Sequence, residues 1–141
     1  MKIILPLSVT IPRKTKGDKV FNLNLNIYRN THHFTLNTAK KMWSDIVTAA
    51  AIHTKMPSEP PYVFTYTVYP GSGRKFDLGN VCSIIQKFTD DALIELGIIT
   101  DDSYKIIPKV YYRFGTIDKE NPRVELEIES LTGIDYDNLP F

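Results

Sequence analysis

The stretch Tyr62-Val-Phe-Thr-Tyr-Thr-Val-Tyr69, the turn Pro70-Gly-Ser-Gly73 and the segment Leu78 to Leu96 decide the fold of this chain. The first is filled with β-branched and aromatic residues, which predicts a strand. The last has apolar residues at helical spacing and ends before Gly97, which predicts a helix with a glycine stop. A strand, a short turn and a helix in this order are typical of proteins in which helices pack on a sheet.

The flanking segments extend this pattern in both directions. We expect strands over Ile3–Ile11 and Phe21–Tyr28, a helix from Asn37 or Thr38 to His53, and two closing strands, Tyr104–Phe114 and Arg123–Leu131, that pair as a hairpin. The order β-β-α-β-α-β-β predicts an α/β (α+β) fold, in which residues 1–131 form a single domain with a mixed β-sheet and two main helices. Residues 132–141 are expected to form an acidic C-terminal tail.

Composition narrows the possible classes of protein. The 141 residues, 43% of them hydrophobic, suit one globular domain. Cys82 is the single cysteine, which excludes an intrachain disulfide and a four-cysteine zinc site. With one cysteine, no long apolar run and a short apolar start, the sequence predicts a cytoplasmic protein.

The net charge of +1 conceals two halves of opposite sign. Residues 1–76 carry 11 Lys or Arg and 3 Asp or Glu, whereas residues 77–141 carry 6 and 13 respectively. Such segregation is typical of a polyanion partner, an acidic metal site or an acidic tail. Two solvated faces of an ordinary domain are the alternative.

Carboxylates flank the second predicted helix. Asp77 comes just before it, and Asp101-Asp102 follow it. Within the helix, spacings of three and four place a polar stripe on one side: Asn80, Ser83, Lys87 and Asp91. Carboxylates from two segments suit Mg²⁺, and a lysine on the same face suits a phosphate oxygen. The alternative, which spacing alone favours, is a capping aspartate and an ordinary Asp-Asp turn.

The ordered run Asp77-Leu-Gly-Asn80, Lys87-Phe-Thr-Asp-Asp91-Ala-Leu93 and Gly97-Ile-Ile-Thr-Asp101-Asp102 resembles the RusA family of Holliday-junction resolvases. Many members of that family come from phages and prophages. The family pattern is Asp-x-Asp-Asn, a lysine on the following helix, Asp-Ala-Leu, a glycine and an Asp-Asp pair. The segment Asn26–Arg29 and the closing strands also fit. The resemblance implies a homodimeric, Mg²⁺-dependent endodeoxyribonuclease in a bacterial cell that cuts four-way DNA junctions in recombination, repair or phage DNA processing.

The resemblance also implies roles for individual residues. The implied catalytic residues are Asp77, Lys87, Asp101 and Asp102, and the implied metal ligands are Asp77, Asp101 and Asp102. Gly79 stands where the family has its second aspartate. Asp91 and Asp101 are the two candidates for the missing metal ligand, and we expect it to be Asp101. Lys87 is four residues farther from Asn80 than in the family, which moves it by about 6 Å along a helix. Gly79 favours an alternative, a non-catalytic DNA-binding or adaptor protein on the same scaffold.

Basic residues are expected to hold the phosphates of branched DNA. The predicted DNA-binding residues are Arg13, Lys14, Lys16, Arg29, Arg74 and Lys75. Arg74 and Lys75 stand shortly before Asp77, separated from it by Phe76, and the first three belong to a predicted loop. A single surface lysine is more often merely solvated. The prediction of DNA binding therefore rests on the six basic residues together.

The C-terminus, Gly133-Ile-Asp-Tyr-Asp-Asn-Leu-Pro-Phe141, resembles the acidic tip of bacterial single-stranded-DNA-binding proteins. A terminal Phe ring can fill a small apolar pocket while its α-carboxylate meets a basic rim. The predicted docking residues are Asp135, Asp137, Leu139, Pro140 and Phe141, and the expected partners are host proteins that bind such a tip. A protein that acts mainly through this tail, and a tail that folds back on its own domain, are alternatives.

Overall fold

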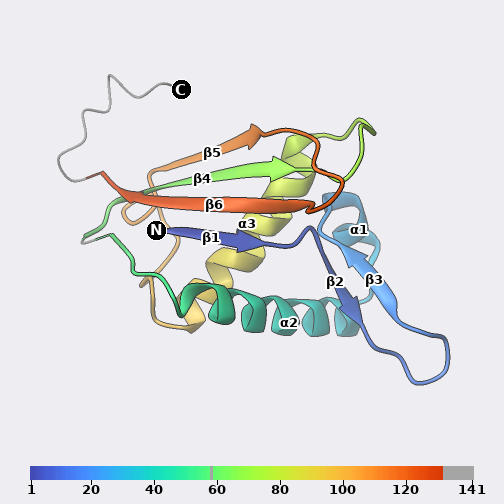
Figure 1. Cartoon of the computed structure of the whole chain (residues 1–141). Coiled ribbons are helices and arrows are strands. Elements are labelled where there is room, and N and C mark those ends of the chain that lie inside the picture. Colours follow the sequence, from blue (N-terminus) through green and yellow to red (C-terminus); the bar gives the residue numbers. More distant parts are fainter. Residues whose placement is uncertain (58, 132–141) are drawn as a thin grey trace.

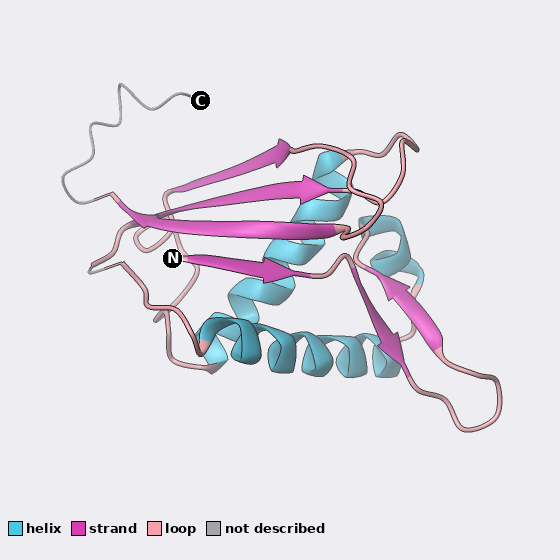
Figure 2. Ribbon diagram, in the orientation of Figure 1, coloured by secondary structure: helices cyan, strands magenta, loops and turns pink. Residues whose placement is uncertain are grey.

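The computed structural model describes residues 1–57 and 59–131 (Figures 1 and 2). The strands are β1 (Lys2–Leu5), β2 (Ser8–Ile11), β3 (Lys19–Asn22), β4 (Tyr62–Tyr69), β5 (Lys109–Phe114) and β6 (Arg123–Ser130). The helices are α1 (Leu25–Asn30), α2 (His33–Ala51) and α3 (Leu78–Glu95). The predicted α+β class, with a mixed sheet and two main helices, is confirmed. None of the helices in the described ranges is long and apolar enough to cross a membrane.

Four strands form one sheet in the order β1-β6-β4-β5, and β2 and β3 pair as a separate antiparallel ribbon. β4 runs parallel to β5 and antiparallel to β6. Its central place follows from its sequence, because seven of its eight residues are buried and such strands are nearly continuous apolar runs. The predicted hairpin of the two closing strands is therefore wrong, since β4 lies between β5 and β6 and α3 carries the chain from β4 to β5.

The two long helices, α2 and α3, cover one face of the four-stranded sheet and pack against each other (Figure 1). Large side chains fill the space between these layers, and Trp43, Phe64 and Tyr66 are fully buried there. Trp43 donates its indole N–H to the hydroxyl oxygen of Thr89 at 3.0 Å. This bond joins the two long helices, because Trp43 lies in α2 and Thr89 in α3.

The N-terminal third differs most from the expected pattern. The predicted strand Ile3–Ile11 is two strands, β1 and β2, with Pro6 in the break between them. The predicted strand Phe21–Tyr28 begins as β3 but turns into α1. Asn24 explains the change, because its Oδ1 accepts the backbone N–H of Asn26 at 2.8 Å and so caps the short helix.

Two element boundaries also shift. α2 starts at His33, earlier than the predicted Asn37 or Thr38, and the ring of His32 accepts the backbone N–H of Phe34 at 3.3 Å at its start. β5 starts at Lys109 rather than at Tyr104, since a turn over 104–106 and then Pro108 precede it. The bounds predicted for β4 are confirmed, and those predicted for α3 and β6 differ by one residue at the C-terminal end.

Gly115 provides a test of how tightly the sheet edge packs. A Cβ at this position would lie 2.5 Å from Cε1 of Tyr69, closer than real contacts allow, whereas a Cβ at Gly73 would meet its nearest atom at 3.5 Å. We expect Gly115→Ala to lower the free energy of unfolding by about 1–3 kcal/mol. Gly73→Ala is the control and should change it by less than about 0.5 kcal/mol. Urea denaturation of both variants measures the difference, and equal values would contradict the packing described.

Candidate functional site

The connection from β4 to α3 lies at the edge of the sheet where the parallel strands β4 and β5 both end (Figure 1). Ligands commonly bind at the carboxyl ends of parallel strands. Asp77 is the N-cap of α3, and its Oδ1 accepts the backbone N–H of Gly79 at 2.8 Å. The residue is exposed, so the same carboxylate that starts the helix is accessible from solvent.

The predicted polar stripe follows α3 away from Asp77. Lys87 and Asp91 are exposed, but the hydroxyl of Ser83 is buried and finds no hydrogen-bond partner among the described residues. Asp91 lines a hollow between α2 and α3 together with Lys40, Lys41, Ser44, Asp45 and Glu95. Lys87 stands ten positions after Asp77, which is about 15 Å along the helix axis. Neither Lys87 nor Asp91 therefore adjoins Asp77.

Asp101 and Asp102 lie near the other edge of the sheet. They follow α3, and the chain must there return to the start of β5, which pairs with the start of β4. The Oδ1 of Asp101 accepts the backbone N–H of Ser103 at 2.7 Å, and hydrogen bonds from the side chain and backbone of Ser103 lower the pKa of Asp101. The 18 residues of α3 span about 27 Å and separate this pair from Asp77.

One chain therefore does not gather the predicted metal ligands. Within residues 1–57 and 59–131, no group of three or more His, Cys, Asp or Glu side chains is placed to hold a metal ion. Gly79 contributes only the N–H that Asp77 binds. The described residues of a single chain do not fit the Mg²⁺ that the resemblance implies.

The predicted DNA-binding residues come from separate segments. Arg13 holds the loop between β2 and β3, donating from Nε to the carbonyl of Gly17 at 2.9 Å and from Nη2 to that of Lys16 at 3.3 Å. The remaining basic residues of the prediction are exposed in this loop, at the end of α1 and before α3: Lys14, Lys16, Arg29, Arg74 and Lys75. A hollow lined by Asn22, Pro70 and Phe76 joins the end of β3 to the β4–α3 connection.

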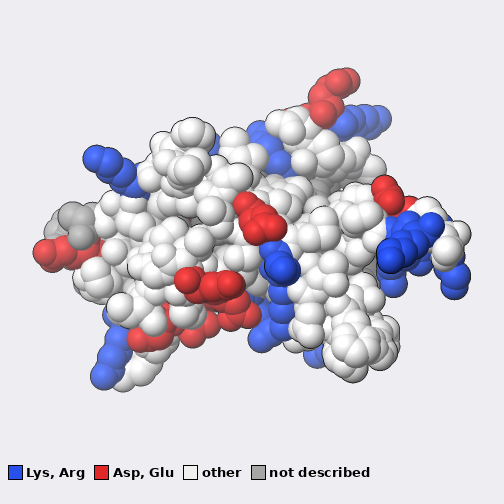
Figure 3. Space-filling model, turned by 90° about the horizontal axis from the view of Figure 1, so that it is seen from below, with Lys and Arg blue, Asp and Glu red and all other residues white. Residues whose placement is uncertain are grey.

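Part of the charge pattern of the sequence is visible on the surface. Figure 3 shows one group of Lys and Arg side chains at the right of the molecule, where Figure 1 places the β2–β3 loop, and further Lys and Arg side chains in the middle and at the left. Asp and Glu side chains gather near the middle and left of the same view, and others lie at the top and at the right. A surface of one sign raises the local concentration of a ligand of the opposite sign, so the basic group at the β2–β3 loop is a surface suited to phosphates.

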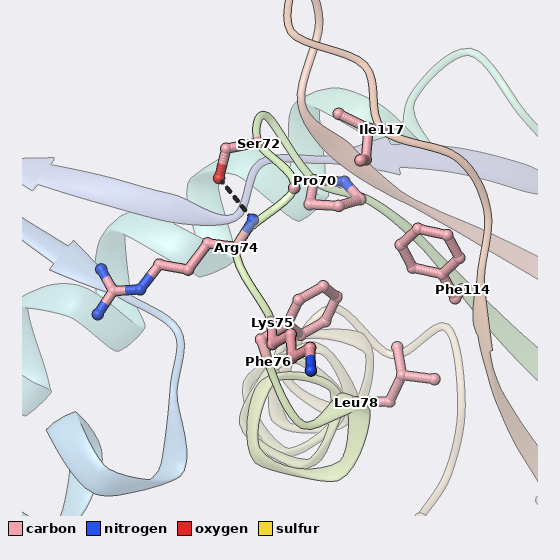
Figure 4. Close-up of a pocket in the computed structure, with 9 residues that line it drawn as sticks. Pro70, Ser72, Arg74, Lys75, Phe76, Leu78, Phe114 and Ile117 are labelled. Carbon is pink, nitrogen blue, oxygen red and sulfur yellow. Dashed lines mark hydrogen bonds between the residues drawn. The ribbon is translucent and has the colours of Figure 1, made fainter.

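A pocket of about 420 Å³ lies between the β4–α3 connection and the segment after β5 (Figure 4). Its walls are apolar and come from both segments: Pro70, Phe76, Leu78, Phe114 and Ile117. Three of these side chains remain exposed, Phe76 by 37%, Phe114 by 53% and Ile117 by 48%. Lys75 lies beside the Phe76 ring, whereas the guanidinium of Arg74 extends away from the pocket (Figure 4).

A polar group outside the predicted site is buried between α3 and the sheet. Asp90 is 3% exposed, and its Oδ2 accepts a hydrogen bond from the amide of Gln86 at 3.4 Å. Gln86 in turn accepts the hydroxyl of Tyr112. The hydroxyl of Tyr66 and Oδ1 of Asp90 find no partner among the described residues. Burial raises the pKa of Asp90 to about 7; the Gln86 hydrogen bond opposes this, and two nearby carboxylates add to it.

Sequence reasoning misses both the pocket and this buried group. Gln86 and Asp90 stand four residues apart, so they share a helix face, and that spacing is the signal that could have found them. Phe114 and Ile117 are far along the chain from Phe76, so no local spacing indicates the pocket. The predicted docking residues Asp135, Asp137, Leu139, Pro140 and Phe141 lie outside the described residues.

No protein-family model matches this chain, and no curated protein matches it. The likeness to RusA resolvases therefore rests on the motif residues and on their order along the chain.

Proposed function

We propose that this protein binds branched DNA and acts on four-way junctions as a structure-selective endodeoxyribonuclease, as the resemblance to RusA resolvases implies. The observation that carries the proposal is the β4–α3 connection, where an exposed carboxylate, Asp77, follows the exposed Arg74 and Lys75 with one residue between them. Lysine and arginine contacts to phosphates position a protein on DNA. A phosphate held by either of these side chains would lie near the carboxylate.

A homodimer is part of this proposal. Because about 27 Å of helix separates Asp77 from Asp101 and Asp102 in one chain, the three carboxylates can act together only if two copies contribute to each site. A two-fold dimer also suits a four-way junction, because both can share the same symmetry axis. Mg²⁺ is the cofactor that the resemblance implies for such a shared site.

Binding is tested by competition between DNA structures. Purified protein is mixed with a labelled four-way junction in EDTA, and unlabelled junction or unlabelled duplex of the same sequence is added. We expect the duplex to compete about tenfold less well than the junction, which is about 1.4 kcal/mol of discrimination. Equal competition by the two DNAs at physiological salt would contradict structure-selective binding.

The β2–β3 loop predicts a salt dependence. Lys14 and Lys16 are exposed at its tip, and each phosphate contact that is lost should reduce the slope of log affinity against log salt by about 0.9. We expect the double variant Lys14→Glu/Lys16→Glu to bind the junction about tenfold or more weakly at low salt and with a shallower slope. Lys55→Glu is the control for a charge reversal outside the loop and is compared with the single variants Lys14→Glu and Lys16→Glu, because Lys55 is exposed but follows α2. If the double variant shows the same slope as this control, the loop is not part of the DNA interface.

A second candidate function is supported by one specific observation. Gly79 replaces a carboxylate of the family motif. This replacement favours a non-catalytic DNA-binding or adaptor protein on the same scaffold. Tight junction binding without any cutting in Mg²⁺ would support this second function over the first.

A further inference from the structure

The pocket between the β4–α3 connection and the segment after β5, here called the aromatic pocket, leaves two phenyl rings accessible to solvent. Phe76 is 37% exposed and Phe114 is 53% exposed. Their ring centroids lie 6.4 Å apart and their planes are tilted by 48°, so the two rings are not stacked on each other. Pro70, Leu78 and Ile117 complete the apolar wall around a volume of about 420 Å³ (Figure 4). Apolar side chains that are exposed together are typical of a binding site, and this volume is typical of ligand pockets.

The charges beside the aromatic pocket are positive. Arg74 and Lys75 are the charged residues that line it, and both are exposed. Within residues 1–57 and 59–131, salt bridges engage Lys2 and Arg123 but neither of these two side chains. Aromatic faces next to available cations suit a nucleotide, because its base has a π-face and its phosphate is negatively charged.

The place of the pocket favours a nucleotide over an acidic apolar peptide, which would satisfy the same charges. Phe76 and Leu78 line the pocket and stand on either side of Asp77 in the chain, where neighbouring Cα atoms are about 3.8 Å apart. A base held in the pocket would therefore have its phosphate group in the neighbourhood of the Asp77 carboxylate. The proposed cleavage requires a phosphodiester at this place, and a peptide ligand does not explain it.

We propose that the aromatic pocket takes an unpaired base of a DNA strand, with the base stacked on Phe114 and the adjoining phosphate held by Lys75. Extruding a base from its stack costs least where pairing is already lost, as at a branch point. Stacking on an aromatic ring then replaces part of the lost base stacking. The role of the pocket rests on the proposed function, because the protein must first bind branched DNA, and it adds the feature of that DNA which the site recognises: an unpaired base next to the phosphate that is cut.

The test compares two four-way junctions of the same sequence in EDTA, so that no DNA is cut. One carries an unpaired adenine at the crossover, and the other carries an abasic analogue at that place, which keeps the phosphate but lacks the base. We expect the wild type to bind the adenine junction about tenfold more tightly, which is about 1.4 kcal/mol and within the range for one stacked base. Equal affinities of the wild type for the two junctions would overturn the proposal and favour a peptide as the occupant.

Three variants locate the base on the protein. Phe114→Ala should bind the adenine junction about tenfold more weakly and the abasic junction as the wild type does, which also shows that the variant is folded. Phe114→Tyr keeps a ring face and should keep the preference for adenine. Phe34→Ala is the matched control, since Phe34 is 69% exposed but lies at the start of α2, outside the pocket lining. If Phe114→Ala retains the full preference, or Phe34→Ala loses it, the base lies elsewhere and the proposal is wrong.

A free nucleotide shares this chemistry, and competition distinguishes it from a base within a strand. Millimolar dAMP should leave the preference for the adenine junction unchanged, because a lone nucleotide lacks the further phosphate contacts that hold a DNA strand. Loss of the preference at this concentration would assign the pocket to a free nucleotide and overturn the assignment to DNA.

The two junctions also separate the pocket from the proposed function. Affinity for the abasic junction measures the backbone contacts on which the proposed function depends, whereas the ratio of the two affinities measures the pocket alone. Abasic junction that binds no better than duplex would contradict the proposed function even if adenine is preferred. Selective binding of both junctions with equal affinity would contradict the role of the pocket and leave the proposed function intact, and failure to bind either junction would overturn both.

Discussion

Asp77→Ser is expected to lower the rate of junction cleavage by about 100-fold, the effect of losing about 3 kcal/mol of transition-state stabilisation. Serine is as good an N-cap as aspartate, so α3 keeps the bond that Asp77 now makes to the N–H of Gly79. The substitution therefore removes the carboxylate but not the helix start. Gel assays of junction cleavage in Mg²⁺ measure the rate, and circular dichroism with urea measures stability.

Two further variants separate chemistry from folding. Asp77→Ala removes the carboxylate and the cap together, so we expect the same loss of cleavage and a decrease of about 1 kcal/mol in the free energy of unfolding. Asp45→Asn, at an exposed carboxylate on α2, should cut at the normal rate. If Asp77→Ser cuts as fast as the wild type, Asp77 has no part in the reaction. If Asp102→Asn also cuts as fast as the wild type, Asp102 is not a catalytic residue either.

Asp90→Asn is expected to stabilise the protein at pH 8 by about 4 kcal/mol and to leave its stability at pH 4 nearly unchanged. The reason is the burial of Asp90, which raises the pKa of this carboxyl to about 7 in the folded protein. The unfolded value is about 3.9, and each unit of difference corresponds to about 1.4 kcal/mol. The folded state thus favours the neutral form, which asparagine imitates.

The direction of this pH dependence follows from whether the folded or the unfolded state binds the proton more tightly. Well below pH 4 both folded and unfolded chains carry a protonated Asp90, so no charge is buried on folding. As the pH rises from about 4 to 7, the unfolded chain ionises first, and stability is lost over this window. Above pH 7 the loss is complete. The groups around Asp90 that contribute to this environment are Gln86, Asp91, Asp102, Tyr66 and Tyr112.

Other acidic groups make the protein more stable as the pH rises, which is opposite to the effect of Asp90. The reason is that hydrogen bonds and ion pairs lower the pKa of Asp101, Asp118 and Glu125. The difference between the wild type and Asp90→Asn at each pH cancels these contributions. Asp45→Asn is the control, since this carboxylate is exposed on α2 and does not contribute to the environment of Asp90, and its effect should stay below about 0.5 kcal/mol. A difference between wild type and Asp90→Asn that is flat from pH 4 to 8 would contradict the burial of an ionisable Asp90.

Local periodicity predicts the elements that carry the strongest patterns. β4 has the predicted bounds and α3 ends one residue before the predicted Leu96, because a long run of one period leaves little choice of structure. The pairing of strands is not local. β5 joins β4 rather than β6, since the buried β4 needs a neighbour on each side, and no spacing within β5 or β6 records that need.

Side-chain capping explains the other main disagreement in the fold. The alternation from Phe21 to Tyr28 favours a strand, but Asn24 offers its side chain to the backbone and starts α1 instead. The candidate site shows the same contrast between local features, which the sequence predicts, and non-local ones, which it does not. The sequence places Asp77 at a helix start, and the structure agrees. The distance from Asp77 to Asp101 and Asp102 depends on the length of α3 and on the direction of the chain after that helix. The motif alone does not indicate this direction.

The most direct test of the proposed function is cleavage of an immobile four-way junction by the purified wild-type protein. The junction is labelled in turn on each strand and incubated with Mg²⁺ or with EDTA, beside a duplex of the same sequence. We predict paired, symmetric nicks near the crossover in Mg²⁺, none in EDTA and none in the duplex. Junction that is bound but remains uncut in Mg²⁺, or duplex that is cut equally well, would contradict the proposal of a structure-selective endonuclease.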